Sequence, residues 1–244
     1  MDVTLDSIRD VRIYQSKSGY RFSVDPVLLY DFVNLEKLTN IADLGAGTGI
    51  IGILLAKKYP CSHVTLIELQ GGLVKLAEKN ISINNLDSRV DIIKCDIREL
   101  AARKFSRSGF DLVVSNPPFR RCNSGRINVE EEKAVARHEI KLNLSELITA
   151  AASLLRSRGR LCIIYHPNRL AELMNTLRKN DIEPKRLRFV HSNILSEAKM
   201  VLLEAVRGGR PGMRVEKPLY IYDANGSYTD EMMEIYGGCP VSNQ

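Results

Sequence analysis

Short apolar runs alternate with longer segments of helical periodicity along most of the chain. The runs are predicted to be strands of a parallel sheet, because helical segments separate them. These strands are expected at residues 40–44, 63–67, 90–94, 110–115 and 161–165. The helices between and after them are expected at residues 50–59, 72–83, 98–102, 144–156 and 167–179. Such alternation is typical of a doubly wound α/β sheet.

The pattern changes in the last part of the chain. Residues 186–191 and 199–205 are both extended and apolar, with a loop near Asn193 between them. They are predicted to pair antiparallel, which brings the sheet to seven strands and ends it in a reversed C-terminal hairpin. Residues 208–244 then form a C-terminal arm, with a strand near 219–222 and a short helix.

The N-terminal residues are predicted to form a hairpin and a helix before the first core strand. Residues 11–15 and 20–24 alternate in polarity around a Ser18-Gly19 turn, as paired strands do. Asp25-Pro26 then indicates a helix start with proline at the first helical position. This segment either covers one end of the sheet or closes over a ligand.

Length and composition suit one domain. A chain of 244 residues with 44% hydrophobic content can bury a full core. Its expected parts are the N-terminal cover at 1–38, the core at 39–207 and the arm at 208–244. The formal net charge is +6, which is compatible with a polyanionic partner.

Some classes of protein do not fit the sequence. The five cysteines are scattered without a CxxC pair, so reduced thiols are expected instead of a zinc site or a disulfide framework. His63, His166 and His191 show no ligand spacing, and no metal is assigned. No apolar run reaches the roughly 18 residues of a membrane span, and no signal-peptide pattern opens the chain. A cytoplasmic protein is expected, with no membrane contact and no obligate protein partner.

A glycine-rich loop joins the first core strand to the helix that follows. Residues 43–49 read Asp-Leu-Gly-Ala-Gly-Thr-Gly, and glycines there permit a sharp turn and close approach of a ligand. The spacing is GxGxG, whereas the dinucleotide fingerprint GxGxxG would need a glycine at Ile50. The loop therefore favours a cofactor without a pyrophosphate. Its candidate cofactor-binding residues are Asp43, Gly45, Ala46, Gly47 and Gly49.

Glu68 ends the second predicted strand. Ligands of doubly wound sheets lie outside the carboxyl ends of the strands, where a carboxylate can accept hydrogen bonds from ribose hydroxyls. Nicotinamide enzymes use the same contact, so Glu68 alone does not distinguish a nicotinamide dinucleotide from a cofactor without a pyrophosphate. The alternative is a charge at the N-terminus of the next helix.

Asn116-Pro117-Pro118-Phe119 directly follows the fourth predicted strand. Two prolines cannot continue that strand, because neither donates a ladder hydrogen bond and both fix φ at about −65°. The chain therefore leaves the sheet between a polar amide and an aromatic ring. By strand alternation, Ser115 should point away from Asn116. Alone the stretch is compatible with a rigid loop, but the glycine-rich loop in the same strand-then-loop context indicates a reaction site.

Together these two motifs resemble the amino-group methyltransferases of class I, which use S-adenosylmethionine (SAM), have a Rossmann-like fold and carry (Asn/Asp/Ser)-Pro-Pro-aromatic as a hallmark. Nearly the whole chain is similar to the bacterial tRNA (adenine-N6) methyltransferases that act on the anticodon loop of a valine tRNA. The matching positions are residues 20–25, 43–49, 116–119, 136–139 and 218–222, with Glu68 and Asp96. The resemblance implies methylation of a flipped-out adenine at N6, which releases S-adenosylhomocysteine (SAH).

The resemblance also implies roles for individual residues. The Asn116 side-chain oxygen and the Pro117 carbonyl would accept from the exocyclic amine, and Phe119 would stack on the base, with Pro118 completing the catalytic stretch.

On the cofactor side, Asp96 resembles the residue that accepts from the adenine amino group of SAM, with the Ile97 N–H available to ring N1. An N-cap for the next short helix is the alternative role of Asp96. Leu69 and Asn116 complete the candidate cofactor set.

Basic residues follow the proline pair. Arg120, Arg121 and Arg126 lie in a Gly/Ser-containing loop and would hold substrate phosphates, unless the loop is only solvated. Asp25, Arg137 and His138 are further candidates for RNA contact. For His138 a catalytic base and an ordinary loop or core histidine both stay open.

Other functions share part of this signature. Guanine-N2 methyltransferases of rRNA and glutamine methyltransferases of release factors carry the same Asn-Pro-Pro-aromatic motif. A protein substrate predicts weak salt dependence of binding, whereas phosphate contacts predict a steep one. A non-catalytic RNA-binding protein would be favoured by loss of Asn116 or of the glycines, and both are present. The GxGxG spacing disfavours a nicotinamide oxidoreductase.

Overall fold

The computed structural model describes residues 3–16, 24–100, 109–117 and 143–237. The strands are β1 (Val3–Ile8), β2 (Val11–Ser16), β3 (Asn40–Leu44), β4 (His63–Glu68), β5 (Val90–Lys94), β6 (Phe110–Ser115), β7 (Leu155–Tyr165), β8 (Ile182–His191), β9 (Ala198–Arg207), β10 (Arg214–Val215) and β11 (Leu219–Tyr220). The α-helices are α1 (Asp25–Phe32), α2 (Ile50–Lys58), α3 (Gly71–Ile83), α5 (Leu144–Leu154), α6 (Leu170–Lys179) and α7 (Asp230–Tyr236). Two 3₁₀ turns are η1 (Ile97–Glu99) and η2 (Pro167–Arg169).

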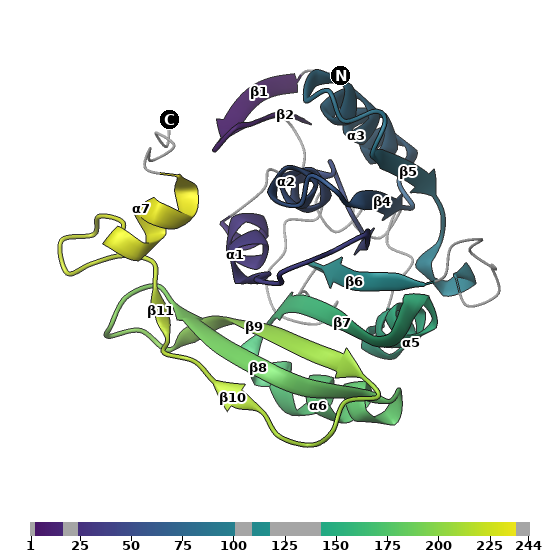
Figure 1. Ribbon diagram of the computed structural model, residues 1–244. Coiled ribbons are helices and arrows are strands. Elements are labelled where there is room, and N and C mark those ends of the chain that lie inside the picture. The colour runs from purple at the N-terminus through teal and green to yellow at the C-terminus, as the bar shows by residue number, and fades with distance from the viewer. Residues whose placement is uncertain (1–2, 17–23, 101–108, 118–142, 238–244) are drawn as a thin grey trace, which may run out of the picture.

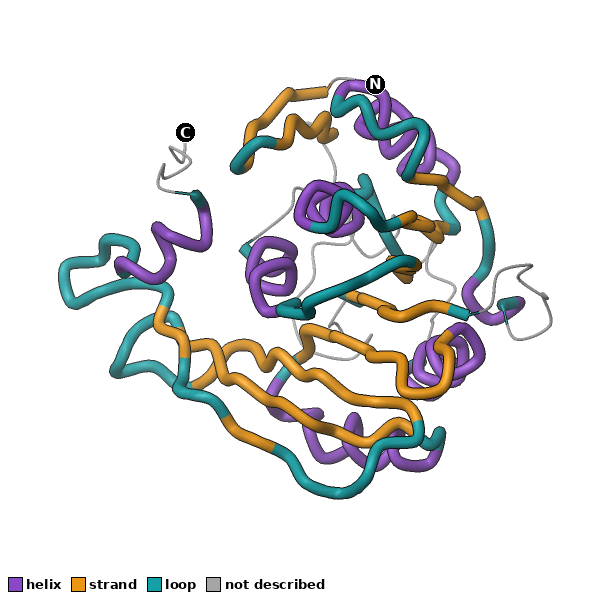
Figure 2. The backbone as a smooth tube through the Cα atoms, in the orientation of Figure 1, coloured by secondary structure: helices purple, strands orange, loops and turns teal. Residues whose placement is uncertain are grey.

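A mixed sheet with the strand order β10-β8-β9-β7-β6-β3-β4-β5 runs through the protein (Figure 1). The strands β3 to β7 are parallel, whereas β9 runs antiparallel to both β7 and β8. The predicted doubly wound sheet of seven strands with a reversed hairpin is therefore confirmed. Two short strands pair with β8 and bring the sheet to nine strands: β11, which confirms the strand expected near residues 219–222, and β10, which was not predicted. Figure 2 shows the loop after β9 curving around the outer edge of β8.

Helices cover both faces of the sheet, which separates two clusters of buried side chains. Side chains of α1, α2 and α3 belong to one buried cluster, and those of α5 and α6 belong to the other. Every residue of β6 is buried, as expected for a central parallel strand with helices on both faces. None of the helices in the described part of the chain is long and apolar enough to span a membrane.

The helix α2 lies very close to β4, because two glycines leave room for it. A Cβ atom on Gly52 would lie 2.2 Å from Leu66 Cδ2, and one on Gly49 would lie 2.8 Å from Leu66 Cδ1. These contacts fix the start of α2, and with it the end of the glycine-rich loop.

The strand at residues 11–15 has a partner that was not predicted. This strand, β2, pairs with β1, so that Ile8 faces Val11 and Asp6 faces Ile13. The connecting turn places Arg9 at a φ of 53°, a conformation that usually selects glycine or asparagine. Because arginine gives no turn signal, the sequence pattern did not indicate this hairpin. Residues 17–23, with the expected Ser18-Gly19 turn, lie outside the described residues.

Two helix boundaries also differ from expectation. Helix α1 begins one residue early, at Asp25, with Val24 as its N-cap and Pro26 in the second helical position. Helix α5 ends at Leu154 instead of residue 156, and β7 begins at once. The gap left between the helix expected at 144–156 and the strand expected at 161–165 lies inside β7, where Arg158 has a φ of 62° and the pairing with β6 shifts register. A bulge within a long strand was therefore mistaken for a loop.

Candidate active site

Three of the predicted motifs meet at the carboxyl edge of the sheet. Leu44, the last residue of β3, lies opposite Ile67 of β4 on one side and Ser115 of β6 on the other. The glycine-rich loop, Glu68 and Asn116 therefore leave three adjacent strands at the same level. Neighbouring strands are about 4.8 Å apart, so these groups line one crevice. The strand β3 is also the point where the winding of the sheet reverses, which is where doubly wound sheets bind ligands.

The glycine-rich loop is held in a conformation that needs glycine. Gly45, Gly47 and Gly49 have φ values of 70°, 59° and 86°. The amides of Gly45 and Ala46 donate to the Ile67 carbonyl at 2.9 and 3.1 Å, and the Gly49 amide donates to the Ala46 carbonyl at 2.9 Å. Apart from their chain neighbours, none of the described residues has an atom within 4 Å of where a Cβ on Gly45 or Gly47 would be. Both glycines therefore face open space into which a ligand can fit closely.

Glu68 fixes this loop from the side of β4. The residue is 6% exposed, and its carboxylate accepts from the Gly47 amide at 2.9 Å and from the Gln70 amide at 2.8 Å. Gln70 is the N-cap of α3, so the alternative role at a helix N-terminus is observed. A carboxylate has about four acceptor positions, which leaves capacity for ribose hydroxyls as well.

Asp43 lies at the base of the loop and is fully buried. One carboxylate oxygen, Oδ2, accepts from the Gly52 amide at 3.1 Å, and the other, Oδ1, has no hydrogen-bond partner. Burial raises the pKa of Asp43 to about 7, the Gly52 amide opposes this rise, and the nearby Glu68 charge adds to it. A buried carboxylate oxygen without a partner, next to an open glycine loop, is suited to a ligand that carries a positive charge or a donor.

The Asp43→Asn substitution is expected to remove a pH-dependent loss of stability. The pKa of Asp43 is near 3.8 when unfolded and about 7 when folded, so the folded state holds this proton more tightly. Stability should therefore fall as the pH rises through this window and level off above it. Relative to the Asn variant, the wild-type free energy of unfolding should drop by up to about 3 kcal/mol between pH 4.5 and 7.5. Urea denaturation at both pH values checks this, and equal changes in the two proteins would contradict it.

Asp96 is engaged by its neighbour. It caps η1 by accepting from the Arg98 amide at 2.9 Å, and both carboxylate oxygens also contact the Arg98 guanidinium. Hydrogen bonding to that guanidinium holds the pKa of Asp96 below its usual range. The N-cap alternative is thus confirmed, and contact with a cofactor adenine stays a prediction. Ile97 is buried and begins η1, and Leu69 is half-buried after β4.

Asn116 and Pro117 are half-buried at the end of β6. The preceding Ser115 is fully buried, and its hydroxyl donates to the Leu44 carbonyl at 2.8 Å. This bond joins the carboxyl ends of β6 and β3 one residue before Asn116. The backbone that carries the Asn116 side chain is therefore fixed beside the loop. The remaining predicted substrate residues, Pro118, Phe119, Arg120, Arg121, Arg126, Arg137 and His138, lie outside the described residues.

Asp25 lies in the first turn of α1. Burial, the neighbouring Tyr228 and Tyr222, and the Asp25 charge together raise the pKa of Tyr236 in α7. This arrangement places Asp25 close to the C-terminal arm, and its expected contact with RNA remains a prediction. Across the described ranges, no three metal-ligating side chains come together.

Sequence reasoning missed two residues that shape the site. Gly52 lets α2 approach β4, and Asn80 of α3 donates to the Thr48 carbonyl of the loop at 2.9 Å. A glycine two residues into an otherwise apolar helix was an available signal for the first. A single asparagine on a helix gives no comparable signal, because its partners are distant in sequence.

The strand order and the loop define a class of protein. A sheet with β3 at the switch point and β9 reversed, a GxGxG loop after β3 and an acidic residue ending β4 make up the class I SAM-dependent methyltransferase fold. The chain belongs to the methyltransferase small domain family, which matches residues 25–180.

Similar proteins agree with this assignment. Two curated relatives, from Flavobacteriaceae bacterium (strain 3519-10) and Porphyromonas gingivalis (strain ATCC BAA-308 / W83), are both named tRNA1(Val) (adenine(37)-N6)-methyltransferase and are 29% identical to this chain. The first match covers 79% of each chain, and the second covers 96% of this chain and 94% of the relative. The crystal structure of a predicted O-methyltransferase, protein Atu636 from Agrobacterium tumefaciens, shares the fold, with a TM-score of 0.69 and 21% identity over 88% of this chain and 96% of that one.

SAM is the cofactor of this class, and the residues present fit it. Open space beside Gly45 and Gly47 admits a ligand against the backbone, and the buried Asp43 oxygen offers it an acceptor. The glycine-rich loop and Glu68 stay the residues predicted to hold it. The prediction of a SAM-dependent methyltransferase is confirmed.

Proposed function

We propose that this protein transfers a methyl group from SAM to N6 of an adenine in tRNA. The main support is the position of Asn116-Pro117, which leaves β6 directly beside the glycine-rich loop. The relatives that carry this activity in their names align with nearly the whole chain, which favours adenine in tRNA over the guanine and glutamine alternatives.

The chain's own residues would make a poor nucleophile reactive. When bound, SAM supplies an electrophilic methyl group on its sulfonium sulfur. The exocyclic nitrogen of adenine reacts slowly because its lone pair is delocalised into the ring. Asn116 Oδ1 and the Pro117 carbonyl would each accept one N–H, which favours a pyramidal nitrogen with its lone pair directed at the methyl group. Pro118 restricts Pro117 to extended conformations and thereby limits the direction of that carbonyl.

Catalysis in this scheme depends on alignment. Holding the amine in line with the methyl group converts a bimolecular reaction into an effectively unimolecular one. The target base must be unstacked or extruded to reach the crevice, and Phe119 would stack on it, which contributes about 1–3 kcal/mol. The amine proton becomes acidic only after methyl transfer, so this scheme needs no strong base.

The test uses purified protein, labelled SAM and total RNA from a strain that lacks the protein. After digestion to nucleosides, label is expected in N6-methyladenosine from the tRNA fraction, and an Asn116→Ala sample taken at the same time should carry far less of it. Label in guanosine or in rRNA would support a methyltransferase with a substrate other than the one proposed. Label in a protein fraction alone would favour the glutamine alternative.

Replacing Arg120, Arg121 and Arg126 together with glutamine is expected to weaken RNA binding and its salt dependence. If each arginine holds one phosphate, the slope of log K against log[salt] should become shallower by about 2 for a single-stranded site. Filter binding of tRNA at several salt concentrations measures the slope. A triple replacement of Lys37, Arg178 and Lys179, which precede β3 or end α6 at the opposite edge, is the control. Equal slopes in the two triple variants would place the RNA surface elsewhere.

A further inference from the structure

The N-terminal hairpin is attached to α3 through two asparagine side chains. The Tyr14 amide donates to Asn80 Oδ1 at 2.7 Å, and Asn80 Nδ2 donates back to the Tyr14 carbonyl at 3.2 Å. In the same way, the Arg12 amide donates to Asn84 Oδ1 at 3.0 Å, and Asn84 Nδ2 donates to the Arg12 carbonyl at 2.7 Å. Each side-chain amide therefore pairs with the backbone N–H and C=O of one residue of β2, as a neighbouring strand would.

The spacing of the two pairs explains why this works. Two residues along a strand advance about 6.6 Å, and four residues along a helix advance about 6 Å. Arg12 and Tyr14 are therefore in register with Asn84 and Asn80. The open edge of β2 is paired without a further strand, and the hairpin is held at a fixed height along α3.

Asn80 differs from Asn84 in its third contact. Asn80 Nδ2 also donates to the Thr48 carbonyl of the glycine-rich loop, at 2.9 Å. Asn80 is fully buried. Asn84 Nδ2 instead donates to the Asn80 carbonyl of its own helix at 2.7 Å. Within this pair, only Asn80 joins the hairpin to the loop.

We propose that Asn80 is a positioning residue for the cofactor, which couples the N-terminal hairpin to the glycine-rich loop. Thr48 stands between Gly47 and Gly49, two residues with left-handed φ values and little intrinsic conformational preference. Glu68 holds the loop at the Gly47 amide from β4, and Asn80 holds the next peptide from α3. The loop is therefore fixed from two sides before the cofactor arrives, which lowers the entropy cost of binding.

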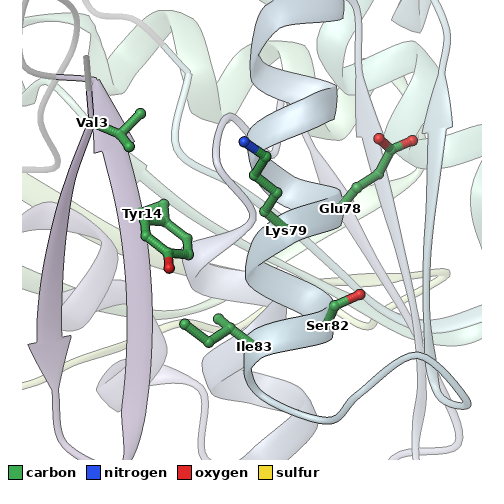
Figure 3. Close-up of a pocket in the computed structure, with 6 residues that line it drawn as sticks. All are labelled: Val3, Tyr14, Glu78, Lys79, Ser82 and Ile83. Atoms are coloured by element: carbon green, nitrogen blue, oxygen red, sulfur yellow. The ribbon is translucent and has the colours of Figure 1, made fainter. Parts of the chain in front are cut away.

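The surface beside this junction is hollowed. A groove between the hairpin and the exposed side of α3 is lined by Val3, Tyr14, Glu78, Lys79, Ser82 and Ile83, with Lys79 and Ile83 on the side of α3 toward Tyr14 (Figure 3). Apolar packing is thus incomplete on this side of the junction. Among the described residues, the polar attachment of the hairpin to α3 consists of the paired hydrogen bonds of Asn80 and Asn84 and one bond from the Arg12 guanidinium to the Ile83 carbonyl at 3.1 Å.

The test compares Asn80→Ala with the matched variant Asn84→Ala. Both remove a pair of hydrogen bonds to β2, so both should lower the midpoint of thermal unfolding by similar amounts. Only Asn80→Ala should weaken SAH binding, by about tenfold, because one hydrogen bond that orders the loop is lost. Isothermal titration with SAH, at a temperature where both variants are folded, measures this difference. If Asn80→Ala is too unstable to purify, Asn80→Ser replaces it with less disturbance of the buried space.

Equal SAH affinity in the Asn80 and Asn84 variants would overturn the proposal, whether both match the wild-type protein or both are weakened. Hydrogen exchange provides a second measurement: the amides of residues 45–49 should exchange faster in the Asn80 variant than in the Asn84 variant. Neither measurement needs a methyl acceptor. The result therefore stands independently of whether tRNA is the substrate.

Discussion

An Asn116→Ala variant is expected to lose about two to three orders of magnitude in turnover, with SAH affinity within about threefold of wild type. In the proposed mechanism the Asn116 oxygen accepts from the target amine, and this contact matters most as the nitrogen becomes pyramidal. The cofactor loop is held by Ile67, Glu68 and Asn80 instead. Removing the amide should therefore affect kcat and leave cofactor binding nearly intact.

Single-turnover transfer from labelled SAM and titration with SAH measure the two quantities separately. Asn116→Asp is the matched variant, because it keeps an acceptor oxygen at the same position and should retain part of the activity. Unchanged turnover in Asn116→Ala would exclude Asn116 from the reaction. A parallel loss of SAH affinity would instead mean that Asn116 acts mainly by holding the cofactor.

The central part of the fold was predictable because its strands are buried on both faces. β3, β4 and β6 are short apolar runs that end in a polar or glycine-rich stretch, and each begins and ends within a residue of the expected position. The convergence of the glycine loop, Glu68 and Asn116 then follows from topology alone. In a parallel sheet, all carboxyl ends lie on one edge.

The elements that were missed depend on partners distant in sequence. The strand β1 contains Thr4 and Asp6, whose side chains bond each other and, through Asp6, also Gln15 across the hairpin. Thr4 favours a strand, but Asp6 disfavours one by itself. The start of β7 is set by Asp111 of β6, which accepts from the Thr39 and Asn40 amides and pairs with Arg156. Because Arg156 forms this ion pair with β6, it lies in β7 and does not continue α5.

The same reasoning applies within the candidate site. The sequence predicts which groups gather at the edge, but not which of them already have partners. Asp96 is bound by Arg98, Glu68 by two backbone amides, and Asp43 keeps one oxygen without a partner. Only the structure distinguishes these three carboxylates, and it assigns them different capacities to meet a ligand.

A Glu68→Ala variant is expected to lower the affinity for SAM and SAH by at least about 100-fold, since two charge-assisted hydrogen bonds are lost at about 1.5–3 kcal/mol each. One of these bonds holds the Gly47 amide of the loop, and the other holds the Gln70 amide at the start of α3. The variant also loses the acceptor proposed for the cofactor ribose. Turnover at saturating SAM should fall much less than affinity.

Glu68→Gln provides the graded control. Its amide oxygen can replace one of the two acceptors, while its NH2 group cannot accept from the other backbone amide. An intermediate affinity is therefore expected, about tenfold below wild type. Wild-type affinity in Glu68→Ala would show that the loop keeps its shape without this carboxylate and that the ribose is bound elsewhere.

Combining Glu68→Ala with Asn80→Ala tests whether the two side chains hold one loop. Glu68 fixes the Gly47 amide and Asn80 fixes the Thr48 carbonyl, so the first substitution already frees the segment that the second would release. The combined loss of SAH affinity should be smaller than the sum of the separate losses, as expected for residues that share a partner. Strict additivity would mean that the two residues support separate parts of the cofactor site, because independent contacts lose affinity independently.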